Sequence, residues 1–175
     1  MLSKHLLVPF LLSSAFVLAS GAASATVIEA TASPFTGDPL SVAISIDDAA
    51  DPGNLVITVS VDGDDPTGDL RGFFAQVADE SLLAGLSVSG AGVSNATFSA
   101  NGVINLGGGN NLNGGGSPCP CDLGLAIGSP ALGSDDIQSV TFTLSHATES
   151  LDVSFLNQQL FGVRATSVGS PDGGR

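Results

Sequence analysis

The sequence has no tryptophan and no tyrosine, two cysteines, and only four lysine and arginine residues against 17 aspartates and glutamates. The formal net charge of −13 excludes unaided nucleic-acid binding, because cationic side chains are needed to replace the counterions of the phosphates. Without tryptophan or tyrosine, a carbohydrate site built on flat aromatic rings is not expected. The hydrophobic content of 43% is too high for a typical disordered acidic segment, and 175 residues are too few for two ordinary domains.

Residues 1–25 have the features of a secretory signal peptide. Lys4 and His5 precede an apolar run over residues 6–18, and the small residues Ala23, Ser24 and Ala25 follow it. The run is about 13 residues long, shorter than the roughly 20 residues that a membrane-spanning helix requires. The pattern predicts cleavage after Ala25 and a secreted or cell-surface protein with no transmembrane segment after cleavage.

Removal of the signal peptide takes away the only lysine and leaves three arginines, Arg71, Arg164 and Arg175. Three explanations of this acidic composition stay open. Lysine-poor acidic surfaces suit a saline habitat, the carboxylates can hold cations, and net charge by itself keeps a protein soluble.

The remaining chain predicts a single all-β domain over residues 26–168, with a flexible tail at 169–175. Residues 42–47, 55–62, 140–145 and 151–155 alternate between large apolar and mostly small or polar side chains. A period of two places one face of a strand in a core and the other in water, as in antiparallel sheets. Weaker strand patterns share richness in Val, Ile, Thr, Ser and Phe between turn residues. They cover residues 26–32, 70–78, 86–89, 93–99, 103–106, 123–127 and 161–167.

About nine to ten short strands of this kind predict an antiparallel β-sandwich or jelly roll. Residues 79–83, Asp-Glu-Ser-Leu-Leu, predict one short helical turn, since acidic residues favour a helix N-terminus. The glycine-rich run at residues 107–118 predicts a flexible loop.

The order of these segments resembles a known class of domain. Strands near LSVAISI and LVITVSV lead into GDLRGFFAQVADESLLAGLSVSG, and a late strand, DDIQSVTFTLS, follows. This order is similar to the cohesin-like and carbohydrate-binding-module-like β-sandwiches of exported bacterial proteins. The passages LRGFF, DESLL and FGVR…SVG also resemble exported bacterial surface proteins of unassigned function. The first resemblance implies a binding module, and the second implies no particular activity.

Two groups of aspartates are candidates for calcium ligands. One comprises Asp47, Asp48 and Asp51, and the other Asp62, Asp64, Asp65 and Asp69. Calcium binds six to eight oxygens, and Asp62 and Asp64 are spaced as alternate carboxylates of a tight loop. The second group is not an EF-hand, because Pro66 replaces a ligand. The two groups would also lie at opposite ends of adjacent antiparallel strands. The alternative interpretation is ordinary turn chemistry, in which aspartate and glycine are common.

Cys119 and Cys121 flank Pro120. In an exported protein two cysteines suggest a disulfide, although a bridge across one residue closes a small ring that would be strained. An interchain bridge, free thiols and, less readily, a metal site are the alternatives, since two thiols alone are an incomplete zinc site.

Nothing in the sequence matches a hydrolase or phosphate-binding motif. His146, with Asp152, is the one combination that would suggest a general base. The phenylalanines mostly occupy core positions, and of the adjacent pair Phe73 and Phe74 one must face away from the core or into a second layer. We therefore expect a noncatalytic extracellular structural or adhesion module that binds protein or matrix, with calcium as a potential stabiliser. A carbohydrate-binding module is the alternative, and an exported hydrolase is the third.

Overall fold

The computed structural model describes residues 26–34, 37–63, 66–112, 119–129 and 135–169. The predicted signal peptide at 1–25 and residues 170–175 of the predicted tail lie outside the described residues. The described chain consists of strands and two short 3-10 helices. They are β1 (Val27–Ala32), β2 (Val42–Asp47), β3 (Leu55–Val61), β4 (Thr67–Ala75), η1 (Glu80–Gly85), β5 (Leu86–Ser89), β6 (Val93–Val103), β7 (Cys121–Ile127), β8 (Ser139–His146), η2 (Val153–Phe155) and β9 (Phe161–Gly169).

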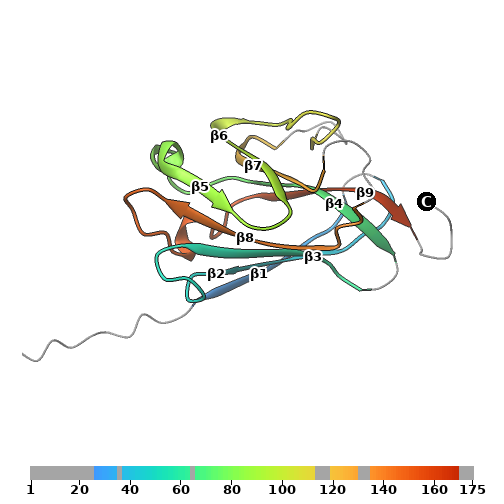
Figure 1. Cartoon of the computed structure of the whole chain (residues 1–175), viewed down its shortest axis with the longest axis horizontal. Helices are drawn as coiled ribbons and strands as arrows, with labels where there is room; N and C mark the ends of the chain where they lie inside the picture. Colours follow the sequence, from blue (N-terminus) through green and yellow to red (C-terminus); the bar gives the residue numbers. More distant parts are fainter. Residues whose placement is uncertain (1–25, 35–36, 64–65, 113–118, 130–134, 170–175) are drawn as a thin grey trace, which may run out of the picture.

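The strands form two antiparallel sheets. The five-stranded sheet has the order β1-β2-β3-β8-β5, and the four-stranded sheet has the order β6-β7-β4-β9. Figure 1 shows them as two layers, with β2, β3 and β8 in one and β4, β7 and β9 in the other. The predicted all-β sandwich is confirmed. The part of the chain that the structure describes contains no helix long and apolar enough to cross a bilayer.

The main core lies between the two sheets and follows from the period-two alternation. On β2 and β3, alternate residues such as Ile44, Ile46 and Ile57 are fully buried. Phe73 of β4 faces this core, where its ring centroid lies 5.6 Å from that of Phe142 on β8. Burial of such side chains supplies most of the favourable free energy of folding.

Phe74 belongs to a second, smaller apolar cluster with Val103, Leu112 and Cys121. This confirms that one residue of the phenylalanine pair faces a second layer. Phe74 pairs with Gly124 on β7 and with Gly162 on β9. A Cβ on Gly124 would lie 2.6 Å from Val103, and one on Gly162 would collide with Leu112. The two glycines therefore leave room for residues 104–112, here called the cover segment, to pack on the outer face of the four-stranded sheet.

The prediction of a strand at residues 151–155 is wrong. Residues 153–155 form η2, and Asp152 caps it by accepting a hydrogen bond from the amide of Ser154 (2.8 Å). Leu151 and Phe155 are both buried while the residue between them, Val153, is only partly so. The backbone is extended at the cap Asp152 and turns into η2 after it, so Leu151 and Phe155 both reach the core although they do not lie on one strand.

Other boundaries also differ from prediction. The pattern at 93–99 belongs to β6, which continues to Val103, so residues 104–106 of the strand predicted at 103–106 lie beyond its end. Strand β9 continues through Gly169, which was expected to start the tail. Of the predicted flexible loop at 107–118, the described part is ordered by turn bonds, such as Asn110 N to Gly107 O (2.9 Å), while 113–118 lie outside the described residues. The helical turn predicted at 79–83 is confirmed as η1, whose cap Asp79 accepts from the amide of Ser81 (2.9 Å).

Candidate functional site

The first aspartate group stabilises the turn between β2 and β3. Asp47 accepts hydrogen bonds from the amides of Ala49 (2.7 Å) and Ala50 (3.1 Å). Asp48 accepts from the amides of Thr26 (3.0 Å) and Val153 (3.3 Å), which ties the start of the described chain and η2 to this turn. Asp51 is exposed in the same turn. These contacts are those of turn chemistry, in which aspartates satisfy free backbone N–H groups.

The second aspartate group is divided. Asp62 is exposed just after β3, where its amide donates to Ser41 O (2.9 Å), so it lies at the opposite end of the β2–β3 pair from Asp47. Asp69 is buried within β4 and accepts from the amide of Ile137 (3.1 Å) and from Arg71 (3.4 Å). The structure thus separates Asp69 from Asp62, and Asp64 and Asp65 lie outside the described residues. Among the described residues, no three His, Cys, Asp or Glu side chains form a group that could hold a metal.

Calcium binding at the Asp62 loop stays a prediction, now without Asp69 as a free ligand. A ligand of the native state at a hundred times its Kd stabilises that state by about 2.7 kcal/mol, so binding is expected to raise the Tm by several degrees. Thermal unfolding followed by far-UV circular dichroism, in calcium and in chelator at matched ionic strength, measures the shift. Magnesium and the variant Asp62→Asn are the controls. An equal Tm in calcium, magnesium and chelator would contradict the prediction.

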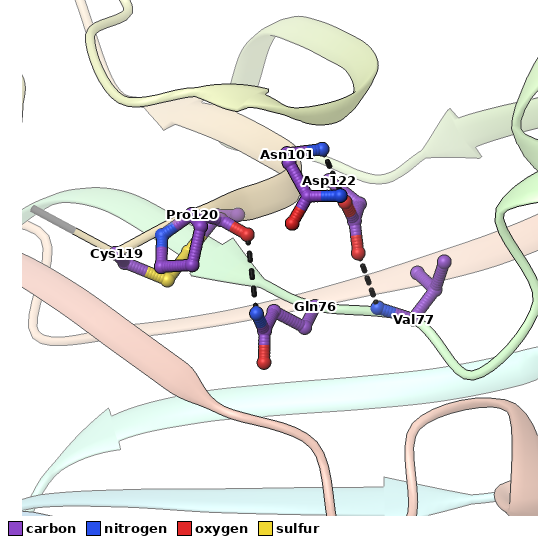
Figure 2. The surroundings of a disulfide bond; sticks show 7 residues. Gln76, Val77, Asn101, Cys119, Pro120 and Asp122 are labelled. Atoms are coloured by element: carbon purple, nitrogen blue, oxygen red, sulfur yellow. Dashed lines mark hydrogen bonds between the residues drawn. A yellow bond between two sulfur atoms is a disulfide. The ribbon is translucent and has the colours of Figure 1, made fainter.

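The two cysteines form a disulfide, with the Cα atoms 5.2 Å apart. Figure 2 shows that it lies beside a group of hydrogen bonds that join β7 to its neighbours. Gln76 donates to Pro120 O (3.2 Å), and the buried Asp122 accepts from the amides of Val77 (2.9 Å) and Asn101 (2.6 Å). Asp122 and Gln76 therefore fasten the beginning of β7 to the segments that follow β4 and to β6, while the disulfide constrains only residues 119–121.

His146 and Asp152 take part in separate local contacts. The Nδ1 atom of His146 accepts from the amides of Thr148 (3.2 Å) and Glu149 (2.9 Å). The side chain and then the backbone of Ser154 donate to Asp152 and lower the pKa of its carboxyl group below the ordinary value. Both side chains thus satisfy nearby turn groups, which does not favour a hydrolytic pair.

A hollow of about 880 Å³ opens on the outer face of the four-stranded sheet, and sequence analysis did not foresee it. All four strands contribute to its floor, and the cover segment forms one wall. Among the residues that the structure describes, its lining contains two arginines and several neutral polar residues but no carboxylate. The lining residues that carry polar side chains are Arg71, Ser94, Asn95, Asn110, Ser129, Arg164 and Thr166. In a chain with 17 acidic residues and four lysine and arginine residues, this lining is unusual in its sign of charge.

Arg71 is a structural element of this hollow. Its guanidinium group contacts Asp69 (3.4 Å) and Asp135 (3.8 Å) and donates to the carbonyl of Ser129. The amide of Ser129 donates to Asp135 (2.7 Å) and, more than the charge of Arg71, lowers the pKa of that carboxyl group. Two carboxylates therefore compensate the charge of Arg71.

Arg164 differs, since its side chain makes no hydrogen bond or ion pair with any residue that the structure describes, and its Nε atom is buried without a partner. Thr166 Oγ1 and Asn110 Oδ1 are also buried without a partner. Arg164, Thr166 and Asn110 line the hollow, whereas the fourth such atom among the described residues, Asp135 Oδ1, belongs to a carboxylate that faces Arg71. Buried polar groups are nearly always paired in folded proteins, so unpaired groups that gather at one cavity indicate a place for a polar ligand or ordered water.

The sequence contained only a partial signal for this site. Gly162, Arg164 and Thr166 alternate along β9, which places them on the outer face, while Val163 and Ala165 pack against the main core. That alternation is visible in the sequence and could have predicted that Arg164 and Thr166 lie on the same face of their strand. The approach of Asn110 could not, because it donates to Arg71 O across 39 residues of chain.

A second hollow, of about 520 Å³, lies along the edge of the sandwich where β9 passes near β1. It shares Arg164 with the first hollow, but Asp38 also lines it, so its lining is of mixed charge. The search for relatives gives no guide to either hollow: no family model matches the chain, and neither a curated protein nor a solved structure is significantly similar to it.

Proposed function

We propose that the protein is a noncatalytic exported module that binds an extracellular polymer through the outer face of its four-stranded sheet. The observation that carries the proposal is the hollow on this face, whose lining residues Arg164, Thr166 and Asn110 each contain a buried polar atom without a hydrogen-bond partner. Concave sites with a few convergent polar groups are the usual places where proteins bind ligands.

The contacts of the remaining polar residues support a noncatalytic role. Asp47, Asp48, Asp122 and Asp152 accept backbone hydrogen bonds, and His146 does the same through Nδ1. General acid–base catalysis needs a titrating group placed beside the reacting atoms. These groups instead hold turns and strand ends. The proposal also includes export, for which the signal-peptide pattern of residues 1–25 is the support.

The test uses protein purified after export, applied to immobilised matrix proteins, neutral polysaccharides and acidic polysaccharides. We expect saturable binding to at least one polymer, with no change in its chain length. Ala126 lies on β7 in the floor of the hollow, and Ala126→Trp fills part of it. This variant is expected to weaken binding at least tenfold, which corresponds to about 1.4 kcal/mol.

The matched control is Ala43→Trp, which adds the same side chain to the outer face of the five-stranded sheet. It is expected to bind as the original protein does. Each variant would contain the only tryptophan of its chain, so its fluorescence also reports whether the ligand contacts that position. Cleavage of a polymer, binding to none of them, or equal binding by the two variants would overturn the proposal.

A further inference from the structure

We propose that the hollow on the four-stranded sheet recognises a uronic-acid-type sugar, with Arg164 pairing with the carboxylate of the sugar and with Thr166 and Asn110 bonding to its hydroxyl groups. This inference rests on the proposed function and names the chemical class of its ligand. The charge of the hollow, its neutral polar groups and its size all favour this ligand.

The charge of the hollow is set by Arg164. Arg71 is compensated by Asp69 and Asp135, whereas Arg164 has no carboxylate within ion-pair distance among the described residues. A guanidinium group presents several N–H donors in a planar fork that matches a carboxylate. The net charge of −13 repels an approaching anion, so an anionic group needs a cation that no carboxylate compensates in order to bind. Arg164 is therefore the place where an anionic group is best accommodated.

The neutral groups fit hydroxyls better than a second charge. Asn110 donates through its amide nitrogen to Arg71 O, which leaves Oδ1 as an acceptor without a donor. Thr166 Oγ1 can both donate and accept, and no described group bonds to it. An unpaired acceptor favours a ligand that carries O–H donors. A carboxylate surrounded by hydroxyl groups is the chemistry of a uronic acid.

The size of the hollow agrees with this ligand. Its volume of about 880 Å³ lies in the range of small-molecule sites, about 300–1,000 Å³, and suits one or two sugar rings. The floor around Ala126 and Gly128 is formed of small residues, so a ring can approach the backbone closely. No aromatic side chain lines the hollow, so affinity must come from the ion pair and the hydrogen bonds.

The experiment titrates the exported protein with digalacturonate by isothermal titration calorimetry. We expect saturable binding that weakens as sodium chloride is raised, because the pair at Arg164 is partly solvent-screened. Arg164→Gln is expected to weaken binding ten- to hundredfold, in line with about 1.5–3 kcal/mol for a hydrogen bond to a charged group. The methyl ester of digalacturonate is expected to lose affinity to a similar extent, and only for protein that retains Arg164.

The matched control is Arg175→Gln, which removes an equal charge from the C-terminal end of the chain and is expected to leave binding unchanged. Circular dichroism confirms that each variant keeps its fold. If Arg164→Gln binds digalacturonate as the original protein does, the inference is overturned. If polyglutamate competes as well as digalacturonate, the site reads a carboxylate alone, and the sugar is overturned.

The two proposals fail in distinguishable ways. If no uronate binds but another polymer does, and Ala126→Trp abolishes that binding, the uronate inference falls and the proposed function stands. If neither uronate nor any polymer binds, both fall.

Discussion

Replacing Asp122 with alanine is expected to lower the free energy of unfolding by about 2–4 kcal/mol, because it leaves the buried N–H of Val77 and the partly buried N–H of Asn101 without an acceptor. The loss is about 1–3 kcal/mol for the buried group and less for the other. Asp122 is 2% exposed, and its two carboxylate oxygens accept from the amides of Val77 and Asn101. Hydrogen bonds to a charged acceptor are among the stronger ones in proteins. As Figure 2 shows, one side chain joins three segments at this point.

Urea unfolding followed by far-UV circular dichroism measures the loss as a lower midpoint with an unchanged slope. Asp122→Asn keeps one acceptor oxygen but places an NH₂ group against the second amide, so it is expected to recover only part of the stability. Asp38→Ala is the matched control, since it removes the same charge from an exposed position and is expected to change stability by less than about 0.5 kcal/mol. If Asp122→Ala lowered the free energy of unfolding no more than Asp38→Ala does, the hydrogen bonds of Asp122 would not stabilise the fold.

The contrast between these two aspartates illustrates what the sequence could predict. Alternation along single strands predicted β2, β3 and β8, because one face of each is buried and the signal is local. The same alternation wrongly predicted a strand at residues 151–155, where Leu151 and Phe155 are both buried but the chain turns into η2 after Asp152. Nothing local distinguishes Asp122 from Asp38, because the partners of Asp122 lie 45 and 21 residues away in sequence.

The candidate site depended on the same kind of long-range information. Acidic residues are abundant in the sequence, yet seven of the described ones accept hydrogen bonds from backbone amides. The sequence did not show that Arg164 lines a hollow. The strand order β6-β7-β4-β9 shows it, because it places β9 beside β4, next to Arg71 and its two carboxylates. Strand order depends on the packing of the whole domain, so local patterns in a single sequence do not predict it.

Replacing Phe74 with alanine is expected to cost about 3–5 kcal/mol, the usual range for a buried phenylalanine. Phe74 is fully buried, although it faces away from the main core. Its ring lies between Gly124 and Gly162, where neighbouring backbone cannot move inward to fill the space without repacking Leu112 and Val103. We therefore expect a true cavity beneath the cover segment, and not only a lower stability.

Hydrogen exchange separates these two effects. The amides of Leu106, which donates to Asn110 O (2.8 Å), and of Asn110, which donates to Gly107 O (2.9 Å), lie within the cover segment. In Phe74→Ala they are expected to lose protection at a lower free energy than amides of β2 and β3, because the cover segment opens locally. Phe73→Ala removes the same side chain from the main core and is expected to lower protection throughout the domain. If the two variants gave the same exchange pattern, the cover segment would be part of one cooperative unit with the sandwich.

The outcome bears on the hollow, since Asn110 belongs to both the cover segment and the wall around Arg164. A cover segment that opens in Phe74→Ala carries Asn110 Oδ1 away from the ligand without altering the guanidinium group. Digalacturonate binding is then expected to weaken while its dependence on salt stays the same, because salt acts on the ion pair and not on the neutral hydrogen bond. Arg164→Gln is expected to reduce that salt dependence. A Phe74→Ala variant that lost the salt dependence as well would show that the second apolar cluster also positions Arg164.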